Sequence, residues 1–251
     1  MVLEFFSALL AYLKGLGLIR SHHLTRYFIV PAIWSSLILT TLFAATLYFF
    51  AAPLGALVAG WLTWIPWDAA DRFLAGHTIW IGGLLIGLLG IIVLKNLLMA
   101  IMSPFMSPLS QEVEQLLTGS DPETSFSGNR LVYEFVRGLR LAVGNLFREL
   151  AWTILWLALG LIPVLGWIAP VLIFLTQSYF AGFGNLDYTM ERHLSRRQSR
   201  QFIKEHRGMA LGNGIPFMLL LFVPVIGFML APPLATVAGT ISSIRKIPAK
   251  Y

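Results

Sequence analysis

Long apolar runs separated by short charged segments dominate the pattern of the chain. Residues 27–67 contain no charged side chain, and a second apolar run covers residues 77–94 before Lys95 and Asn96 interrupt it. A helix needs about 20 apolar residues to cross the hydrocarbon core of a bilayer. The pattern therefore predicts two transmembrane helices within residues 27–102, and we expect the second to outlast the bilayer and emerge at its end.

The residues before these spans combine apolar and polar positions. In residues 1–14 the apolar side chains share one helical face and the polar ones the other, which predicts a helix lying in the headgroup region. An ordinary packed helix fits the same periodicity equally well. The segment has no basic leader and no A-x-A cleavage site, so we do not interpret it as a signal peptide.

Two further segments follow the predicted spans. Residues 103–127 carry several prolines, glycines and acidic side chains, which predicts a loop with a short helix outside the membrane. Residues 130–150 place apolar side chains on one helical face and Arg130, Glu134, Arg137 and Arg148 on the opposite one. This second pattern predicts an amphipathic helix with a basic outer side.

Two segments of the C-terminal half repeat each other at an offset of 61 residues. Each contains the pattern P-V-x-G, and the two predicted turns hold Pro163, Gly166, Pro170, Pro224, Gly227 and Pro232. The apolar arms on either side have about 12 residues and reach about 18 Å, roughly half of the bilayer core. We therefore predict two hemi-penetrating helical hairpins whose tips lie beside protein or water. A pair of kinked spanning helices is the alternative.

Basic residues gather on one side of this predicted topology. They lie before the first span, before the first hairpin, between the hairpins and at the C-terminus, whereas the link 68–76 carries two aspartates and one arginine. The positive-inside rule then places both termini and both hairpin bases in the cytoplasm. We expect a single all-α membrane domain over residues 1–251, with two transmembrane helices, two hairpins and amphipathic interfacial helices. Its predicted parts are 1–26, 27–102, 103–150, 151–186, 187–208 and 209–244.

The composition supports a membrane protein and excludes several kinds of site. Hydrophobic residues make up 57% of the chain and charged residues 12%, whereas an average soluble domain has about a quarter charged residues. There is no cysteine for a disulfide, a thiol nucleophile or a thiolate metal site. We find no nucleotide-binding, catalytic or metal-ligand motif, so we expect no enzyme activity, cofactor or metal. The basic connector, residues 187–208, suits a cytoplasmic anchor better than a site for nucleic acid or anionic lipid.

Residues 15–26, between the first helix and the first span, have features of an anion site. Glycines allow backbone amides to converge, a helix begins here, and Arg20 and Arg26 supply positive charge. A divalent oxyanion suits this chemistry. A glycine hinge with ordinary positive-inside anchoring explains the same residues.

The order of motifs along nearly the whole chain resembles the CysZ family of bacterial sulfate permeases. Residues 15–31 are similar to the family pattern G-x-x-L-I-x-x-P-G-L-R-R-F-x-x-x-P and keep Gly15, Leu18, Ile19, Leu24, Arg26 and Pro31. Further similarities are Pro104-Phe105, Glu112, Leu117-Thr118-Gly119, Ile162-Pro163, Pro170 and Leu186-Asp187-Tyr188. Where the family has Asn, Pro-Gly and the first Arg of a pair, this chain has Gly17, His22-His23 and Thr25. The broader superfamily also includes the eukaryotic etoposide-induced membrane proteins.

The resemblance implies an inner-membrane permease that takes up sulfate, or a similar oxyanion, for sulfur assimilation and cysteine biosynthesis without nucleotide hydrolysis. With Arg20 in place of the missing arginine, the candidate sulfate-binding residues are Gly15, Leu16, Gly17, Leu18, Ile19, Arg20 and Arg26. Hairpins that enter the bilayer would gain from burial against a second copy, so we expect a homo-oligomer. We also expect Asp187 to cap a helix rather than line a path. A non-transporting membrane scaffold or regulator of the same superfamily is the alternative.

Overall fold

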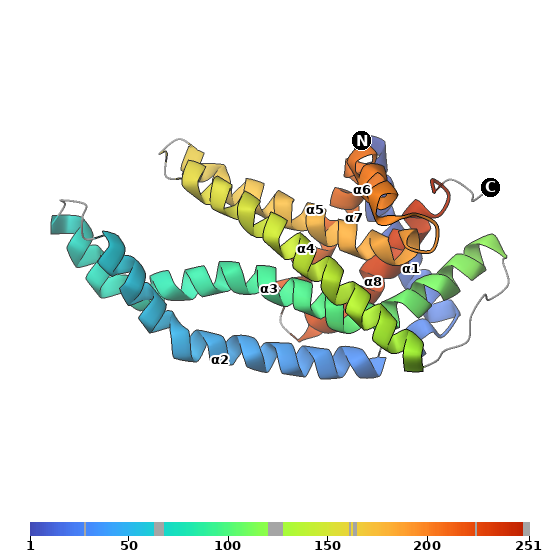
Figure 1. Ribbon diagram of the computed structural model, residues 1–251, viewed down its shortest axis with the longest axis horizontal. Helices are drawn as coiled ribbons and strands as arrows, with labels where there is room; N and C mark the ends of the chain where they lie inside the picture. Colours follow the sequence, from blue (N-terminus) through green and yellow to red (C-terminus); the bar gives the residue numbers. More distant parts are fainter. Residues whose placement is uncertain are drawn as a thin grey trace. The chain divides into compact units, whose positions relative to one another are not determined.

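The computed structural model describes residues 1–27, 29–62, 68–119, 128–160, 162, 165–223 and 225–247, and every regular element within them is helical (Figure 1). The elements are α1 (Val2–Ser21), η1 (Leu24–Tyr27), α2 (Ile29–Leu62), α3 (Asp68–Thr118), α4 (Gly128–Gly160), η2 (Leu165–Trp167), α5 (Ala169–Met190), α6 (Arg196–Glu205), α7 (Arg207–Leu221) and α8 (Ile226–Ser243). Among these residues, four segments are long and apolar enough to cross a membrane: Val2–Ser21, Ala32–Leu57, Ile92–Thr118 and Ile226–Ser243. The predicted all-α class is confirmed, and these helices indicate a membrane protein.

The chain divides into two compact units. The larger unit holds Met1–Ser36 and Lys95–Tyr251, and the smaller unit holds Leu37–Leu94. In the smaller unit α2 and α3 approach closely at Gly90, where an added Cβ would lie 2.7 Å from the ring of Phe43. The single membrane domain expected from the sequence stays a prediction.

The third helix continues through two places where the sequence predicted an interruption. α3 has 51 residues and begins at Asp68, so the predicted polar link is helical from this residue onward. It bends at His77, whose backbone is not helical, and then runs through Pro104 and Pro108. The prediction of a loop from residue 103 is therefore wrong as far as Thr118. Membrane helices tolerate proline because neighbouring groups satisfy the backbone carbonyls that proline leaves unpaired.

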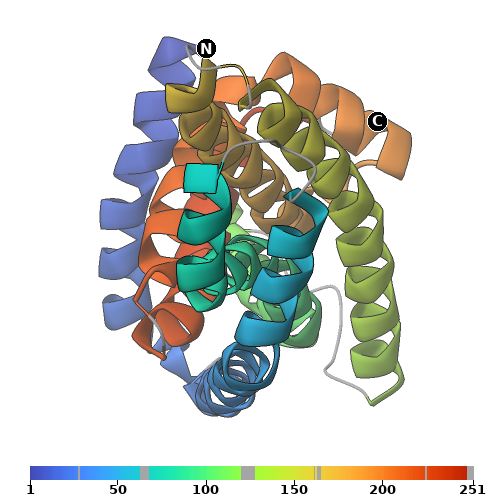
Figure 2. The ribbon, with the colours of Figure 1, turned by 90° about the vertical axis from the view of Figure 1, so that its left-hand side faces the viewer.

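In the larger unit α5 packs against α4, α7 and α8, while α1 packs against α7 and α8, as the blue helix does beside the orange and red ones in Figure 2. Two glycines make the crossing of α5 and α7 a contact between backbones. A Cβ on Gly182 would collide with the carbonyl of Ala210, and a Cβ on Gly214 would collide with that of Ser178. Close packing through small residues is typical of membrane helices. α1 therefore packs within the larger unit, and its position in the headgroup region stays a prediction.

Two helix pairs correspond to the sequence repeat, α4 with α5 and α7 with α8, each joined by a short turn. Their lengths are 33, 22, 15 and 18 residues. Each helix is thus longer than the apolar arm that the sequence predicted, because the more polar residues at its outer end are helical as well. The predicted amphipathic helix and the first arm are one helix, because residues 145–155 contain neither proline nor glycine to separate them. How deeply the pairs enter a bilayer stays a prediction.

Candidate functional site

A cavity of about 250 Å³ lies between α4, α5 and α6, and we call it the arginine pocket. Its charged lining consists of Arg137, Arg140, Arg148, Arg196, Arg200, Asp187 and Glu191. Five guanidinium groups against two carboxylates leave a surplus of three positive charges. Because guanidinium groups present several donors in a fixed plane, a cavity of this kind suits an oxyanion.

The helical repeat of α4 explains three of these arginines. Positions 137, 140 and 148 share one face of an α-helix, and the amphipathic pattern of the sequence already identified this helix as basic on one side. The prediction that this basic side faces outward missed the pocket, because nothing in the local pattern shows that α5 and α6 cover part of it.

The remaining arginines come from the start of α6. Ser195 is the N-cap of α6, and its hydroxyl accepts a hydrogen bond from the backbone N–H of Gln198 while the Gln198 side chain accepts one from the backbone N–H of Ser195. This capping box fixes the first turn, so Arg196 and Ser199 line the pocket together with Ser195. The N-terminus of a helix carries partial positive charge, which adds to that of the guanidinium groups.

Ion pairs offset only part of the positive charge. Nη2 of Arg137 lies 3.2 Å from Oδ2 of Asp187, and the same guanidinium pairs with Glu191. Among the described residues, no carboxylate pairs with Arg140, Arg148, Arg196 or Arg200. Partial burial and, after it, the nearby Arg200 lower the pKa of the Arg148 guanidinium. A bound anion would relieve this repulsion between neighbouring guanidinium groups.

Asp187 has a different role from the one that the sequence predicted. It lies inside α5, is buried to 6% exposure and pairs with Arg137 at the pocket instead of capping a helix. The prediction of a cap is wrong because α5 continues through Asp187 to Met190. The hydroxyl of neighbouring Tyr188 donates a hydrogen bond of 2.8 Å to the carbonyl of Met99, which ties α5 to α3.

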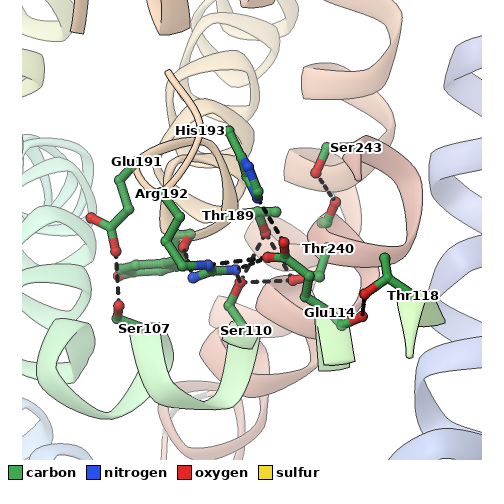
Figure 3. Close-up of polar contacts among 12 residues, drawn as sticks. Ser107, Ser110, Glu114, Thr118, Thr189, Glu191, Arg192, His193, Thr240 and Ser243 are labelled. Atoms are coloured by element: carbon green, nitrogen blue, oxygen red, sulfur yellow. Dashed lines mark hydrogen bonds and ion pairs between the residues drawn. The ribbon is translucent and has the colours of Figure 1, made fainter. Parts of the chain in front are cut away.

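A polar cluster next to the pocket holds the end of α5 in place (Figure 3). Glu191 accepts a hydrogen bond of 2.8 Å from Ser107 of α3, so the pocket and the cluster share this carboxylate. Further along α3, Glu114 pairs with Arg192 at 2.6 Å and with His193 at 2.7 Å. The hydroxyls of Ser110, Thr189 and Thr240 lie 2.9 to 3.0 Å apart and link α3, α5 and α8. No sequence pattern predicted this cluster, because hydrogen-bonded partners within it lie up to 130 positions apart.

A buried ion pair connects α3, α4 and α5. Nζ of Lys95 lies 2.8 Å from Oε2 of Glu149 and 2.8 Å from Oε1 of Gln177, and both ionic side chains are at most 1% exposed. The amide of Asn96 donates to the same carboxylate oxygen at 2.9 Å. We expected Lys95 near the end of a span that leaves the bilayer, whereas its side chain is enclosed by protein.

The N-terminal residues predicted to bind sulfate lie mainly in a helix. Residues 15–20 belong to α1, so their backbone N–H groups are used in the helix, and the expected loop is wrong for this stretch. The chain turns only at His22 and His23, and His23 has a φ of 52°. Gly15 and Ile19 are buried, whereas Leu16, Gly17 and Arg20 are exposed and Leu18 is half-buried. The side chain of Arg26 lies outside the described residues, and no member of this set lines the arginine pocket.

The predicted turn residues divide between the two helix pairs. Gly166 lies in η2, where its N–H donates to the carbonyl of Ile162 at 2.9 Å, and Pro170 lies in the first turn of α5. Gly227 is buried in the first turn of α8 against the carbonyl of Leu220, which a Cβ would strike. Pro232 lies inside α8, so its assignment to the second tip is wrong. Pro163 and Pro224 lie outside the described residues.

Comparison with known proteins agrees with the motif order. The family described as Sulfate transporter CysZ/Etoposide-induced protein 2.4 matches residues 11–232. A protein named Sulfate transporter CysZ from Pseudomonas fluorescens strain Pf-5 is 29% identical over 157 residues, which cover 60% of this chain and 62% of the relative. Its namesake from strain SBW25 is 29% identical over 140 residues, which cover 55% of this chain and 54% of that relative. The chain thus spans less than two thirds of the length of these relatives. Because the family match extends over most of the sequence, the chain belongs to the Sulfate transporter CysZ/Etoposide-induced protein 2.4 family.

Proposed function

We propose that the protein lets sulfate or a similar oxyanion cross the bacterial inner membrane, for use in sulfur assimilation. The observation that carries the proposal is the arginine pocket, whose lining has three more positive than negative charges. The names of the matched relatives support sulfate as the anion. Since the sequence has no nucleotide-binding motif, movement is passive or coupled to another ion.

The pocket lies on the basic side of the topology that the positive-inside rule predicts, with both termini in the cytoplasm. In this arrangement the arginine pocket is a cytoplasmic binding station on the path of the anion. Arg140 and Arg196 are the side chains to test, because they face the pocket from two different helices and pair with no described carboxylate.

The test is sulfate flux into liposomes that contain the purified protein. We expect labelled sulfate to enter these liposomes faster than empty ones. The double substitution Arg140→Gln and Arg196→Gln should slow entry at low sulfate concentration by about tenfold or more, since each charged hydrogen bond to the anion contributes about 1.5 to 3 kcal/mol. Arg197→Gln is the matched control, because Arg197 is exposed on α6 and does not line the pocket. Flux no faster than in empty liposomes would reject the permease and favour the scaffold alternative.

We further propose that the two turns between paired helices remain inside the bilayer, as hemi-penetrating hairpins. Turns in water are rich in polar residues, but these two expose large apolar side chains. Ile162 and Trp167 are 49% and 88% exposed at the first turn, and Phe222 and Ile226 are both 57% exposed at the second. Such surfaces suit lipid.

Cysteine labelling tests this placement, and the chain offers a background without cysteine. A membrane-impermeant thiol reagent added outside the cell should leave Trp167→Cys unlabelled and should label Asp71→Cys, which lies in the predicted outer segment. Labelling of both variants from outside would contradict the hairpin proposal while leaving the flux test unaffected.

The N-terminal set from Gly15 to Arg26 remains a proposed second station for the anion, supported by the family resemblance and by the exposed cation of Arg20. Its helical conformation leaves the two arginines, rather than backbone amides, to hold the ligand. If this station operates, Arg20→Gln with Arg26→Gln lowers sulfate binding even when the arginine pocket is intact. Unchanged binding would remove this set and leave the pocket as the only proposed station.

We also propose that the protein forms a homo-oligomer, because the first half of α2 leaves a large apolar surface exposed. Trp34 is 64% exposed, Leu37 50% and Ile38 56%. Lipid could cover the same side chains, so the mass of the purified particle after subtraction of detergent decides between a single copy and an assembly.

A further inference from the structure

A second cavity, with a volume of about 730 Å³, lies on the other side of Arg148 and Arg200 from the arginine pocket; both arginines line the two cavities. We call it the amphipathic cavity. It is bounded by α4, α5 and the basic stretch that includes α6 and the start of α7. The proposed sulfate station does not use this cavity, and its lining has a different character.

One part of the amphipathic cavity is strongly cationic. Arg148, Arg200, Lys204 and Arg207 line it, and the described lining includes no acidic residue. Arg200, Lys204 and Arg207 are exposed, and the last two do not line the arginine pocket. Four positive charges without a carboxylate partner in the lining favour a ligand that carries a phosphate group.

The other part is apolar and aromatic. Trp152 and Trp156 stack with ring centroids 5.6 Å apart, and the indole N–H of Trp156 donates to Thr176 at 3.0 Å, which fixes the orientation of that ring. Leu172 and Leu175 of α5 complete this side. A free inorganic anion would leave these surfaces uncovered.

The change from charge to apolar surface is abrupt and falls where a bilayer interface is expected. Arg148 is the last basic residue of α4, and the sequence then has no charged side chain from Leu150 to Leu186. Trp152 lies one helical turn beyond Arg148 and is 46% exposed. Tryptophan is enriched at the level of the headgroups, so the cavity lies across the boundary between headgroups and acyl chains.

We propose that the amphipathic cavity binds an anionic phospholipid. Its phosphate contacts the four basic side chains, and an acyl chain lies along Trp152, Leu172 and Leu175. Basic pockets between membrane helices are a known means of holding acidic headgroups. Because Arg148 and Arg200 also face the arginine pocket, the lipid neutralises part of the charge that sulfate would otherwise meet.

The experiment is native mass spectrometry of the detergent-purified protein titrated with phosphatidylglycerol, phosphatidylcholine or inorganic phosphate. We expect phosphatidylglycerol to bind at least about tenfold more tightly than phosphatidylcholine. The double substitution Lys204→Gln and Arg207→Gln should weaken phosphatidylglycerol binding by about 25-fold, because each basic side chain contributes about fivefold near an anionic headgroup. Arg197→Gln with Arg245→Gln removes the same charge outside the cavity and should leave binding unchanged.

A second measurement on the unaltered protein locates the lipid. Phosphatidylglycerol with a photoreactive group in its acyl chain should crosslink to the α4 peptide that contains Trp152. The proposal would be overturned if phosphatidylcholine or inorganic phosphate bound as tightly as phosphatidylglycerol. It would also be overturned if the two double variants lost the same affinity for phosphatidylglycerol, or if the crosslinks were confined to other helices.

Discussion

The buried pair of Lys95 and Glu149 allows a sharp test of what holds α3, α4 and α5 together. Lys95→Met removes the cation, and Glu149 is then left with the Asn96 amide as its partner, because Oε1 of this carboxylate already has no hydrogen bond. Both side chains are at most 1% exposed. Breaking a buried ion pair on one side costs about 3 to 5 kcal/mol, since the remaining charge has neither water nor a counterion.

Glu149→Gln should cost a similar amount, because it leaves the Lys95 ammonium with neutral oxygens alone, those of Gln177 and of the new amide. The double variant has no unpaired charge, so we expect its stability to lie within about 1 to 2 kcal/mol of the unaltered protein. The two single losses would then exceed the double loss by several kcal/mol, which is the signature of direct coupling.

The assay is reversible unfolding in mixed micelles with increasing SDS, followed by the fluorescence of the eight tryptophans. Each variant gives a free energy of unfolding, and the four values close a double-mutant cycle. The reasoning would be refuted if the stability losses of the two single variants added up to that of the double variant, or if each single loss were below about 1 kcal/mol. A buried charge without its partner has a large desolvation cost.

Four further substitutions probe packing and the pocket. Gly182→Ala should cost about 1 to 3 kcal/mol in the same unfolding assay, because the added methyl group strikes the carbonyl of Ala210. Gly17→Ala should be neutral or stabilise by up to about 1 kcal/mol, because nothing lies within 4 Å of the new atom. Comparable losses of stability in the two variants would contradict the packing argument. Arg137→Gln should reduce sulfate flux because it frees two carboxylates inside the pocket, and faster flux would show that repulsion by these carboxylates does not matter. Tyr188→Phe should lower the free energy of unfolding by about 1 kcal/mol through loss of its bond to Met99, and an unchanged value would show that this bond contributes nothing.

Apolar periodicity and charge predicted the helical class and the basic side of α4, because both depend on residues close together in the sequence. Helix boundaries were less predictable. Pro104 and Pro108 favour a loop when the sequence is taken alone, although prolines can continue a membrane helix when neighbouring elements satisfy the backbone. The break expected near Leu150 is absent because hydrophobicity changes there while helix propensity does not.

The arginine pocket could be predicted only in part. Arg137, Arg140 and Arg148 are visible as one basic helix face, and the S-x-x-Q signature at Ser195 marks the start of α6. These two features meet only because of how the helices pack, and a single sequence does not reveal that packing. The partners of Lys95 are hidden for the same reason, since Glu149 and Gln177 lie 54 and 82 positions away.

The glycine contacts between α5 and α7 also restrict how the protein can move. The main chains of the two helices touch directly at Gly182 and Gly214, so neither helix can slide or rotate without a collision. This crossing is therefore rigid. α6 is also held by packing, because its Phe202 and Ile203 are buried in the hydrophobic core. It meets the arginine pocket through Arg196 and Arg200, whose long side chains can change rotamer. An ion should therefore enter or leave through movement of these two side chains, and a crosslink that fixes the backbone of α6 would leave transport unaffected.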